Sequence, residues 1–102
     1  MTVKLVVLYP NPADSDAFER RYRDVHMPLV SKIPGVQRAE TGQVVTSFDS
    51  GSPAFYRVAE LYFADQDALN AGLASAEGKA VAADYQQIAP PGSRMLVELL
   101  DD

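Results

Sequence analysis

The stretch FYRVAELYF, residues 55–63, is the strongest β-strand pattern in the chain and decides the predicted fold. Its aromatic and β-branched residues favour an extended conformation. Apolar side chains occupy both alternating faces, with Phe55, Leu61 and Phe63 on one face and Tyr56, Val58 and Tyr62 on the other. Because a strand with two apolar faces needs cover on both sides, we place it in the centre of a sheet.

Five further segments complete the order of elements. Strands are predicted at residues 3–9, 36–45 and 93–100, and helical segments at residues 16–33 and 65–88. The resulting order predicts the α+β class, with a ferredoxin-like βαββαβ fold in which a four-stranded antiparallel sheet carries its helices on one face. No repeat, low-complexity segment or long linker divides the chain, so we expect a single domain over residues 1–102.

The open face of this sheet predicts self-association. The strand at residues 3–9 is also apolar on both faces, and the helices cover only one of them. The same face of a second copy is the simplest cover for the other. We therefore predict a two-fold homodimer whose sheets pack back to back.

Composition excludes several classes of function. The net charge of −5 opposes binding to nucleic acid and to anionic membranes. An RNA-recognition module shares this order of elements, but residues 55–63 lack the glycine that its third strand requires. The apolar run at residues 5–9 is too short for a signal peptide or a membrane span, so we expect a cytoplasmic protein.

The supply of reactive side chains is equally restrictive. The chain has no cysteine and one histidine, which excludes thiolate nucleophiles, sulfur-based zinc sites and His-rich metal sites within one chain. We expect no metal and no cofactor. A site must be built from carboxylates, tyrosines, arginines, amides, hydroxyls and one imidazole.

The helical segment at residues 16–33 carries the histidine. Asp16 and Glu19 form a capping-box pattern at its start. The predicted apolar stripe consists of Phe18, Tyr22, Val25, Leu29 and Ile33, with Met27 on the opposite side. The sequence Ile-Pro-Gly at residues 33–35 ends the helix.

His26 lies four residues after Tyr22, at the edge of this stripe. Pro28 cannot donate a hydrogen bond to the carbonyl of Asp24, so we expect the helix to kink just after the histidine and to leave space beside it. Two interpretations follow. His26 is a general acid or base in a cavity, or it is a helix-end histidine that satisfies a free carbonyl, which the residues alone favour.

Other polar residues have two interpretations as well. Glu60 and Tyr62 share one face of the central strand, where they either orient the imidazole or lie at the dimer contact. Asp84 is expected to cap or pair near the end of its helix. Arg57 and Arg94 are expected to be edge or interface charges.

Three stretches together resemble the EthD family of the dimeric α+β barrel superfamily. They are FERRYRDVHMPLVSKIPGV at residues 18–36, AELYF at residues 59–63 and SAEGKAVAAD at residues 75–84. The spacing F-x3-Y-x3-H-x-P-L followed by Pro-Gly is specific as a set. The resemblance implies a ferredoxin-like fold, a homodimer that forms a dimeric α+β barrel, and a cavity between helices and sheet bordered by His26 and Tyr22. It therefore favours the functional interpretation of His26.

The resemblance also implies candidate functions. Superfamily relatives include cofactor-free monooxygenases, cyclases and isomerases, and the family takes its name from an association with ethyl tert-butyl ether degradation. We expect a small apolar ligand that is aromatic, quinone-like or polyketide-like, with His26 as the acid or base. The candidate ligand-binding residues are Tyr22, Leu29, Tyr62 and Tyr85. The alternatives are a non-catalytic ligand-binding or accessory protein and, with less support, haem binding through His26.

Overall fold

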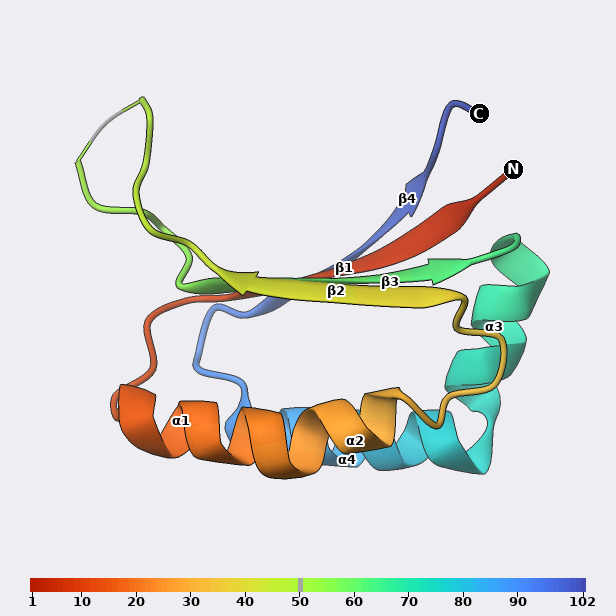
Figure 1. Cartoon of the computed structure of the whole chain (residues 1–102), viewed down its shortest axis with the longest axis horizontal. Helices are drawn as coiled ribbons and strands as arrows, with labels where there is room; N and C mark the ends of the chain where they lie inside the picture. The colour runs from red at the N-terminus through yellow and green to blue at the C-terminus, as the bar shows by residue number, and fades with distance from the viewer. Residues whose placement is uncertain (50) are drawn as a thin grey trace.

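The structure is a computed structural model that describes residues 1–49 and 51–102, and it confirms the ferredoxin-like fold (Figure 1). The strands are β1 (Val3–Tyr9), β2 (Arg38–Gln43), β3 (Arg57–Phe63) and β4 (Arg94–Leu99). The helices are α1 (Ser15–Arg21), a π-helical turn η1 (Tyr22–His26), α2 (Met27–Val30), α3 (Gln66–Ala74) and α4 (Ala76–Ile88). All helices lie on one side of the sheet, and the opposite face carries none (Figure 1).

The sheet has the strand order β2-β3-β1-β4, and its pairs are antiparallel. The two-faced strands β1 and β3 are central, as their composition predicts. Every second residue of both strands is buried against the helices, and the residues between them are partly exposed on the open face. The buried set is Val3, Leu5, Val7 and Tyr9 of β1 with Arg57, Ala59, Leu61 and Phe63 of β3.

Strand β4 lies at the edge and rises away from the helical layer (Figure 1). Its pairing with β1 directs Met95, Val97 and Leu99 to the helical side, yet these side chains are exposed. No helix therefore covers the outer part of β4 fully.

The first helical segment begins earlier than predicted. Asp14, not Asp16, caps it, because the Asp14 carboxylate accepts a hydrogen bond from the backbone N–H of Ala17 at 3.0 Å. Glu19 is not part of a capping box, since its carboxylate bonds to Arg57 instead.

The predicted kink at Pro28 is replaced by a wide helical turn. The backbone N–H of Met27 bonds to the carbonyl of Tyr22, five residues earlier, and the backbone stays helical into α2. A π-helical turn of this kind accommodates one residue more than an α-helical turn. The change follows from Pro28, which has no N–H to bond and crowds the carbonyl four residues before it.

The wide turn moves the buried stripe by one position. Beyond Tyr22, the helix buries His26 and Val30 in place of the predicted Val25 and Leu29. Val25 is 39% exposed. The stripe rejoins the predicted one at Ile33.

The second helical region is a pair of helices. Asp65 caps α3 through the N–H of Ala68, and Ser75 caps α4 through the N–H of Gly78. Helix α4 has 13 residues. Among the described residues, no helix is long and apolar enough to cross a membrane.

Gly72 of α3 allows the helix to lie directly against the turn that follows α2. A Cβ atom at this position would lie 2.6 Å from the carbonyl oxygen of Pro34 and 3.1 Å from Ile33 and Phe63 side-chain atoms. Because the nearest atom belongs to the backbone, it cannot move away at low cost. Gly72 thus sets the distance between α3 and the end of the histidine-bearing helix.

We predict that Gly72→Ala destabilises the fold. Alanine favours a helix over glycine by about 1 kcal/mol, but overpacking costs typically 1–3 kcal/mol, and here the clash is with backbone. Urea denaturation should show a lower free energy of unfolding. Gly42→Ala is the control, since nothing lies within 4 Å of its added Cβ. Equal stability of the two variants would contradict the close-packing argument.

Candidate functional site

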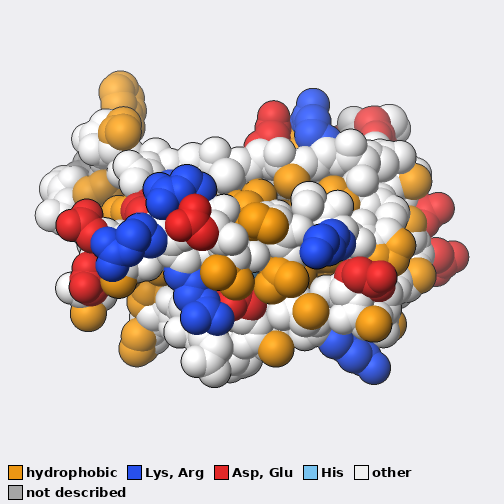
Figure 2. Space-filling view, turned by 60° about the horizontal axis from the view of Figure 1, so that its bottom comes forward, with side chains coloured by type: hydrophobic (Ala, Val, Ile, Leu, Met, Phe, Trp, Pro, Cys, Tyr) orange, Lys and Arg blue, Asp and Glu red, His pale blue; other side chains and the backbone are white. Residues whose placement is uncertain are grey.

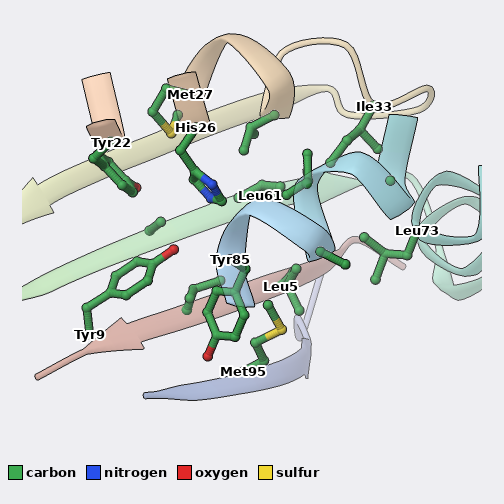
Figure 3. Close-up of a pocket in the computed structure, with 16 residues that line it drawn as sticks. Leu5, Tyr9, Tyr22, His26, Met27, Ile33, Leu61, Leu73, Tyr85 and Met95 are labelled. Carbon is green, nitrogen blue, oxygen red and sulfur yellow. The ribbon is translucent and has the colours of Figure 1, made fainter. Parts of the chain in front are cut away.

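An apolar cavity of about 110 Å³ lies between the helices and the sheet (Figure 3). Most of its wall is aliphatic, from residues such as Leu5, Val7, Val30, Ile33, Leu61, Leu73 and Val81. Among the described lining residues, those whose side chains contain nitrogen or oxygen are His26, Tyr9, Tyr22 and Tyr85. A mainly apolar cavity with a few polar groups is the usual form of a small-molecule site.

His26 projects from the π-helical turn into this cavity (Figure 3). The side chain is buried, with 4% of the residue exposed. Its Nδ1 lies 2.9 Å from Oδ2 of Asp84 on α4. Because an ionised carboxylate only accepts hydrogen bonds, Nδ1 carries the proton in this pair and Nε2 is the free base.

A second residue holds the Asp84 carboxylate. Arg21 of α1 donates from Nε and Nη2 to Oδ1 of Asp84, at 3.0 and 2.6 Å. Asp84 is 5% exposed, so this ion pair supplies the partner that a buried carboxylate requires. The three side chains form a line from the surface, at Arg21, to the cavity, at His26.

Nε2 of His26 is available to a ligand. Within the described residues, no protein atom bonds to it, and no fully enclosed side-chain nitrogen or oxygen is left without a partner. Nε2 therefore retains contact with open space, and the space beside it is the cavity.

The imidazole is held in its neutral form. Burial lowers the pKa of His26 below the ordinary value of 6.5, and this effect outweighs the opposing hydrogen bond and charge of Asp84. The nearby Arg21 charge acts in the same direction as burial. Near neutral pH, His26 is consequently a proton acceptor.

Tyr22 fixes the other side of the imidazole. Its ring stacks on His26, with centroids 5.4 Å apart and an interplanar angle of 22°. The Tyr22 hydroxyl lies 2.8 Å from Oγ1 of Thr41 on β2, and the Arg57 guanidinium lies 4.8 Å from the Tyr22 ring. Burial raises the pKa of Tyr22, so its phenol stays protonated.

Arg57 is a buried charge on the helical side of β3 and not the predicted edge charge. Its Nη2 donates to Oε1 of Glu19 at 2.6 Å, and its Nη1 donates to Thr41 at 3.0 Å. The hydroxyl of Tyr56 also donates to Glu19. Burial opposes ionisation of Glu19, but the hydrogen bonds from Arg57 and Tyr56 together hold the Glu19 pKa below its ordinary value.

Two further tyrosines face the cavity. The Tyr9 ring of β1 lies 5.7 Å from Tyr22 and 5.9 Å from Tyr85 of α4, measured between centroids. Within the described residues, neither the Tyr9 nor the Tyr85 hydroxyl has a hydrogen-bond partner. Burial raises the pKa of Tyr9, which therefore keeps its proton and can donate it in a hydrogen bond.

The predicted site residues divide into two groups. His26, Tyr22 and Tyr85 lie together around the cavity, whereas Leu29 and Tyr62 are not among the residues that line it. Leu29 is displaced by the wide turn, which brings Val30 inward. Tyr62 alternates with the buried residues of β3 and lies on the open face, where its hydroxyl donates to Glu60 and Glu40. The ligand-binding roles of Leu29 and Tyr62 stay predictions, which the lining of this cavity does not support, and the open-face position of Tyr62 agrees with its alternative place at a dimer contact.

Sequence reasoning missed three contributors to this site. Asp84 orients the imidazole, a role considered for Glu60, which lies on the other face of the sheet. The available indication was an acidic residue on the same helical face as Val81 and Tyr85. Tyr9 and Met27 also line the cavity, whereas the regular helix predicted from the sequence places Met27 on the side opposite the apolar stripe.

Charges elsewhere offer no competing site. On the helical face, Lys and Arg side chains are interspersed with Asp and Glu and with apolar groups (Figure 2). Over residues 1–49 and 51–102, no group of three or more His, Cys, Asp or Glu side chains is arranged to hold a metal ion. The apolar cavity at His26 is the best-formed candidate site.

Comparisons with known proteins agree with this architecture. An uncharacterized 11.0 kDa protein of Rhodococcus erythropolis, from the thcB-thcC intergenic region, is 38% identical over 93 residues, covering 91% of this chain and 89% of that protein. An EthD family protein of Bacillus halodurans has a structure that superposes with a TM-score of 0.90 at 31% identity, covering 98% and 99% of the two chains. SnoaB of Streptomyces nogalater, a cofactor-independent oxygenase, has the same fold at a TM-score of 0.72 and 16% identity, covering 99% and 94%.

The family assignment rests on the segment that contains the site. Residues 11–90 match the EthD domain, and this range includes Arg21, His26 and Asp84. The chain belongs to the EthD family.

Proposed function

We propose that this protein binds a small apolar molecule, aromatic, quinone-like or polyketide-like, in the cavity and that His26 acts on it as a general base. The observation that carries the proposal is the Asp84–His26 pair, which directs a neutral imidazole nitrogen into an apolar cavity. Tyr22 and Tyr85 border the bound molecule, and Tyr9 joins them.

The chemistry follows from the orientation of the imidazole. Nε2 accepts a proton from an acidic C–H or O–H of the ligand, while Nδ1–H remains bonded to Asp84. The imidazolium that forms is stabilised by the ionised Asp84, which Arg21 holds in place. The ligand is left as an anion whose charge is delocalised over its own conjugated system.

Such an anion is the common starting point of cofactor-independent oxygenase, cyclase and isomerase chemistry. The fold shared with SnoaB, a cofactor-independent oxygenase, is compatible with this class of reaction. We propose no metal and no cofactor. Haem is disfavoured as a partner, because its macrocycle is far larger than a cavity of about 110 Å³.

A second candidate is a non-catalytic ligand-binding or accessory protein of an oxidative pathway. The feature that favours it is the composition of the cavity wall, in which His26 is the one side chain with an ordinary pKa near neutrality. Binding of an apolar ligand needs no more than such a wall.

We also propose a homodimer formed through the open face of the sheet. This face presents Val6, Leu8, Val58 and Leu96 in register across β3, β1 and β4. Lys4, Glu60 and Glu98 form ion pairs beside this apolar group. A second copy related by a two-fold axis would bury the apolar residues of both chains.

The base role of His26 is testable by substitution. With a substrate found by screening, His26→Ala should lower kcat by about 10²- to 10⁴-fold, the usual contribution of a general acid or base, while ligand binding persists. Val25→Ala, on the exposed side of the same turn, is the matched control. Unchanged turnover in His26→Ala would eliminate the enzyme proposal and leave the binding protein.

The lowered pKa of His26 makes the stability of the fold depend on pH. Because the folded-state pKa of His26 lies below 6.5, the neutral ring contributes stability that is complete above about pH 6.5 and declines as the pH falls toward the folded pKa. Chemical denaturation at a series of pH values should show this decline for the wild type. One proton limits it to about 1.4 kcal/mol per pH unit. His26→Gln should lack this component, and parallel pH profiles of the two proteins would refute it.

The proposed dimer contact is testable through the oligomeric state of two β4 variants. Leu96→Glu places a charge in the apolar part of the open face and should convert a dimer to a monomer in sedimentation velocity at micromolar concentration. Val97→Glu is the control, since Val97 is similarly exposed but lies on the opposite face of β4. A monomeric wild type, or dissociation by Val97→Glu alone, would contradict an interface through this face.

A further inference from the structure

We infer that the cavity selects a neutral ligand with a single-ring phenol or enol as the group that enters it. This inference rests on the proposed function and narrows the substrate class of the same site. It is carried by three features of the cavity: its volume, the absence of charged side chains among its described lining residues, and the presence of one acceptor, His26, with a tyrosine donor, Tyr9.

Volume sets the size of the group. The cavity measures about 110 Å³. A dry apolar cavity of about 150 Å³ holds one benzene molecule. One six-membered ring is thus the upper limit for the buried part of the ligand without movement of the walls, and a fused three-ring system exceeds it.

The wall discriminates against charged groups. Among the described residues that line the cavity, none is Lys, Arg, Asp or Glu. The two charged side chains behind the imidazole, Arg21 and Asp84, are bonded to each other. A carboxylate or phosphate that entered would lose its hydration without gaining a cationic partner, which is strongly unfavourable.

The polar atoms match a hydroxyl on a conjugated ring. Nε2 of His26 accepts a hydrogen bond, because burial keeps the imidazole neutral and the bond to Asp84 keeps its one proton on Nδ1. The Tyr9 hydroxyl, which has no hydrogen-bond partner within the described residues, can donate to the ligand oxygen. In Figure 3, the Tyr9 hydroxyl points toward the interior of the cavity that His26 lines, whereas the Tyr85 ring borders the cavity with its hydroxyl directed away from His26, toward β4.

The same set of atoms serves the reaction. Transfer of the hydroxyl proton to Nε2 breaks the ligand O–H bond and leaves an oxyanion that the Tyr9 hydroxyl stabilises by hydrogen bonding. The proton resides on the imidazole, beside the Asp84 carboxylate. An apolar ring without a hydroxyl would fill the space but leave these polar groups unpaired.

Met95 marks the entrance. It contributes to the cavity wall from β4 and is 44% exposed, and Tyr85 of α4 is partly buried beside the same space. Helix α4 does not cover the outer part of β4 fully, so ring substituents can leave the cavity between these two elements.

The test is a titration of the 102-residue chain with four probes at pH 7.5, followed through the imidazole NMR signals of His26. The probes are phenol, benzene, benzoate and anthrone, of which benzoate alone is ionised at this pH. We expect phenol to shift the signals at millimolar concentration, benzene to bind several-fold more weakly and benzoate at least about tenfold more weakly. Anthrone should give no shift.

Two variants test the location. Met95→Trp should reduce phenol binding by obstructing the entrance. Val97→Trp, two residues further on the same exposed face and outside the cavity wall, should leave it unchanged. Equal effects of the two variants would overturn the assignment of the entrance.

The outcomes separate this inference from the proposed function. Anthrone binding at His26 as tight as phenol would overturn the size limit, and benzoate binding as tight as phenol would overturn the selection against charge. Absence of any shift with phenol would overturn the inference as a whole. The base role of His26 is tested separately, by measuring the turnover of His26→Ala with a substrate found by screening.

Discussion

The wide helical turn at residues 22–26 is the constraint on which the arrangement of the site depends. Pro28 has no N–H, and the hydrogen bond from Met27 to Tyr22 closes the turn one residue later than an α-helix would. The extra residue turns His26 inward and Val25 outward. With a regular α-helix at this point, an aliphatic side chain would face the core, and the imidazole would lie at its edge.

Two ion pairs fix this turn to the rest of the molecule. Glu19, just before it, bonds to Arg57 of the central strand, and Arg21 bonds to Asp84 of α4. Breaking a buried pair by removing one partner typically costs 3–5 kcal/mol, although the pair as a whole adds little net stability. The main effect of the pairs is therefore to fix the position of the turn. A shift of the helix relative to the sheet or to α4 would leave a buried charge unpaired.

The architecture was predictable from sequence to a greater degree than the site was. The alternation of apolar residues in β1 and β3 identifies both central strands, and Asp65 marks the start of α3, because both patterns reflect local geometry. The pairing of His26 with Asp84 joins residues 58 positions apart and depends on the wide turn, which no local spacing revealed. The same turn places Leu29 outside the cavity lining. For Tyr62 the sequence left two alternatives, because alternation alone does not say which face of a strand meets the helices.

The base role proposed for His26 depends on the different surroundings of the two sides of its ring. On its Asp84 side the ring meets a carboxylate that is already neutralised by Arg21, and on its other side it meets an apolar cavity. The apolar side favours the neutral ring, and the carboxylate stabilises the ring once a proton arrives. In fully apolar surroundings, Nε2 would be a poor base. Beside a carboxylate without a cationic partner, the ring would stay protonated. Because Asp84 is bonded to Arg21, the ring lies between these two cases and can take up a proton and release it.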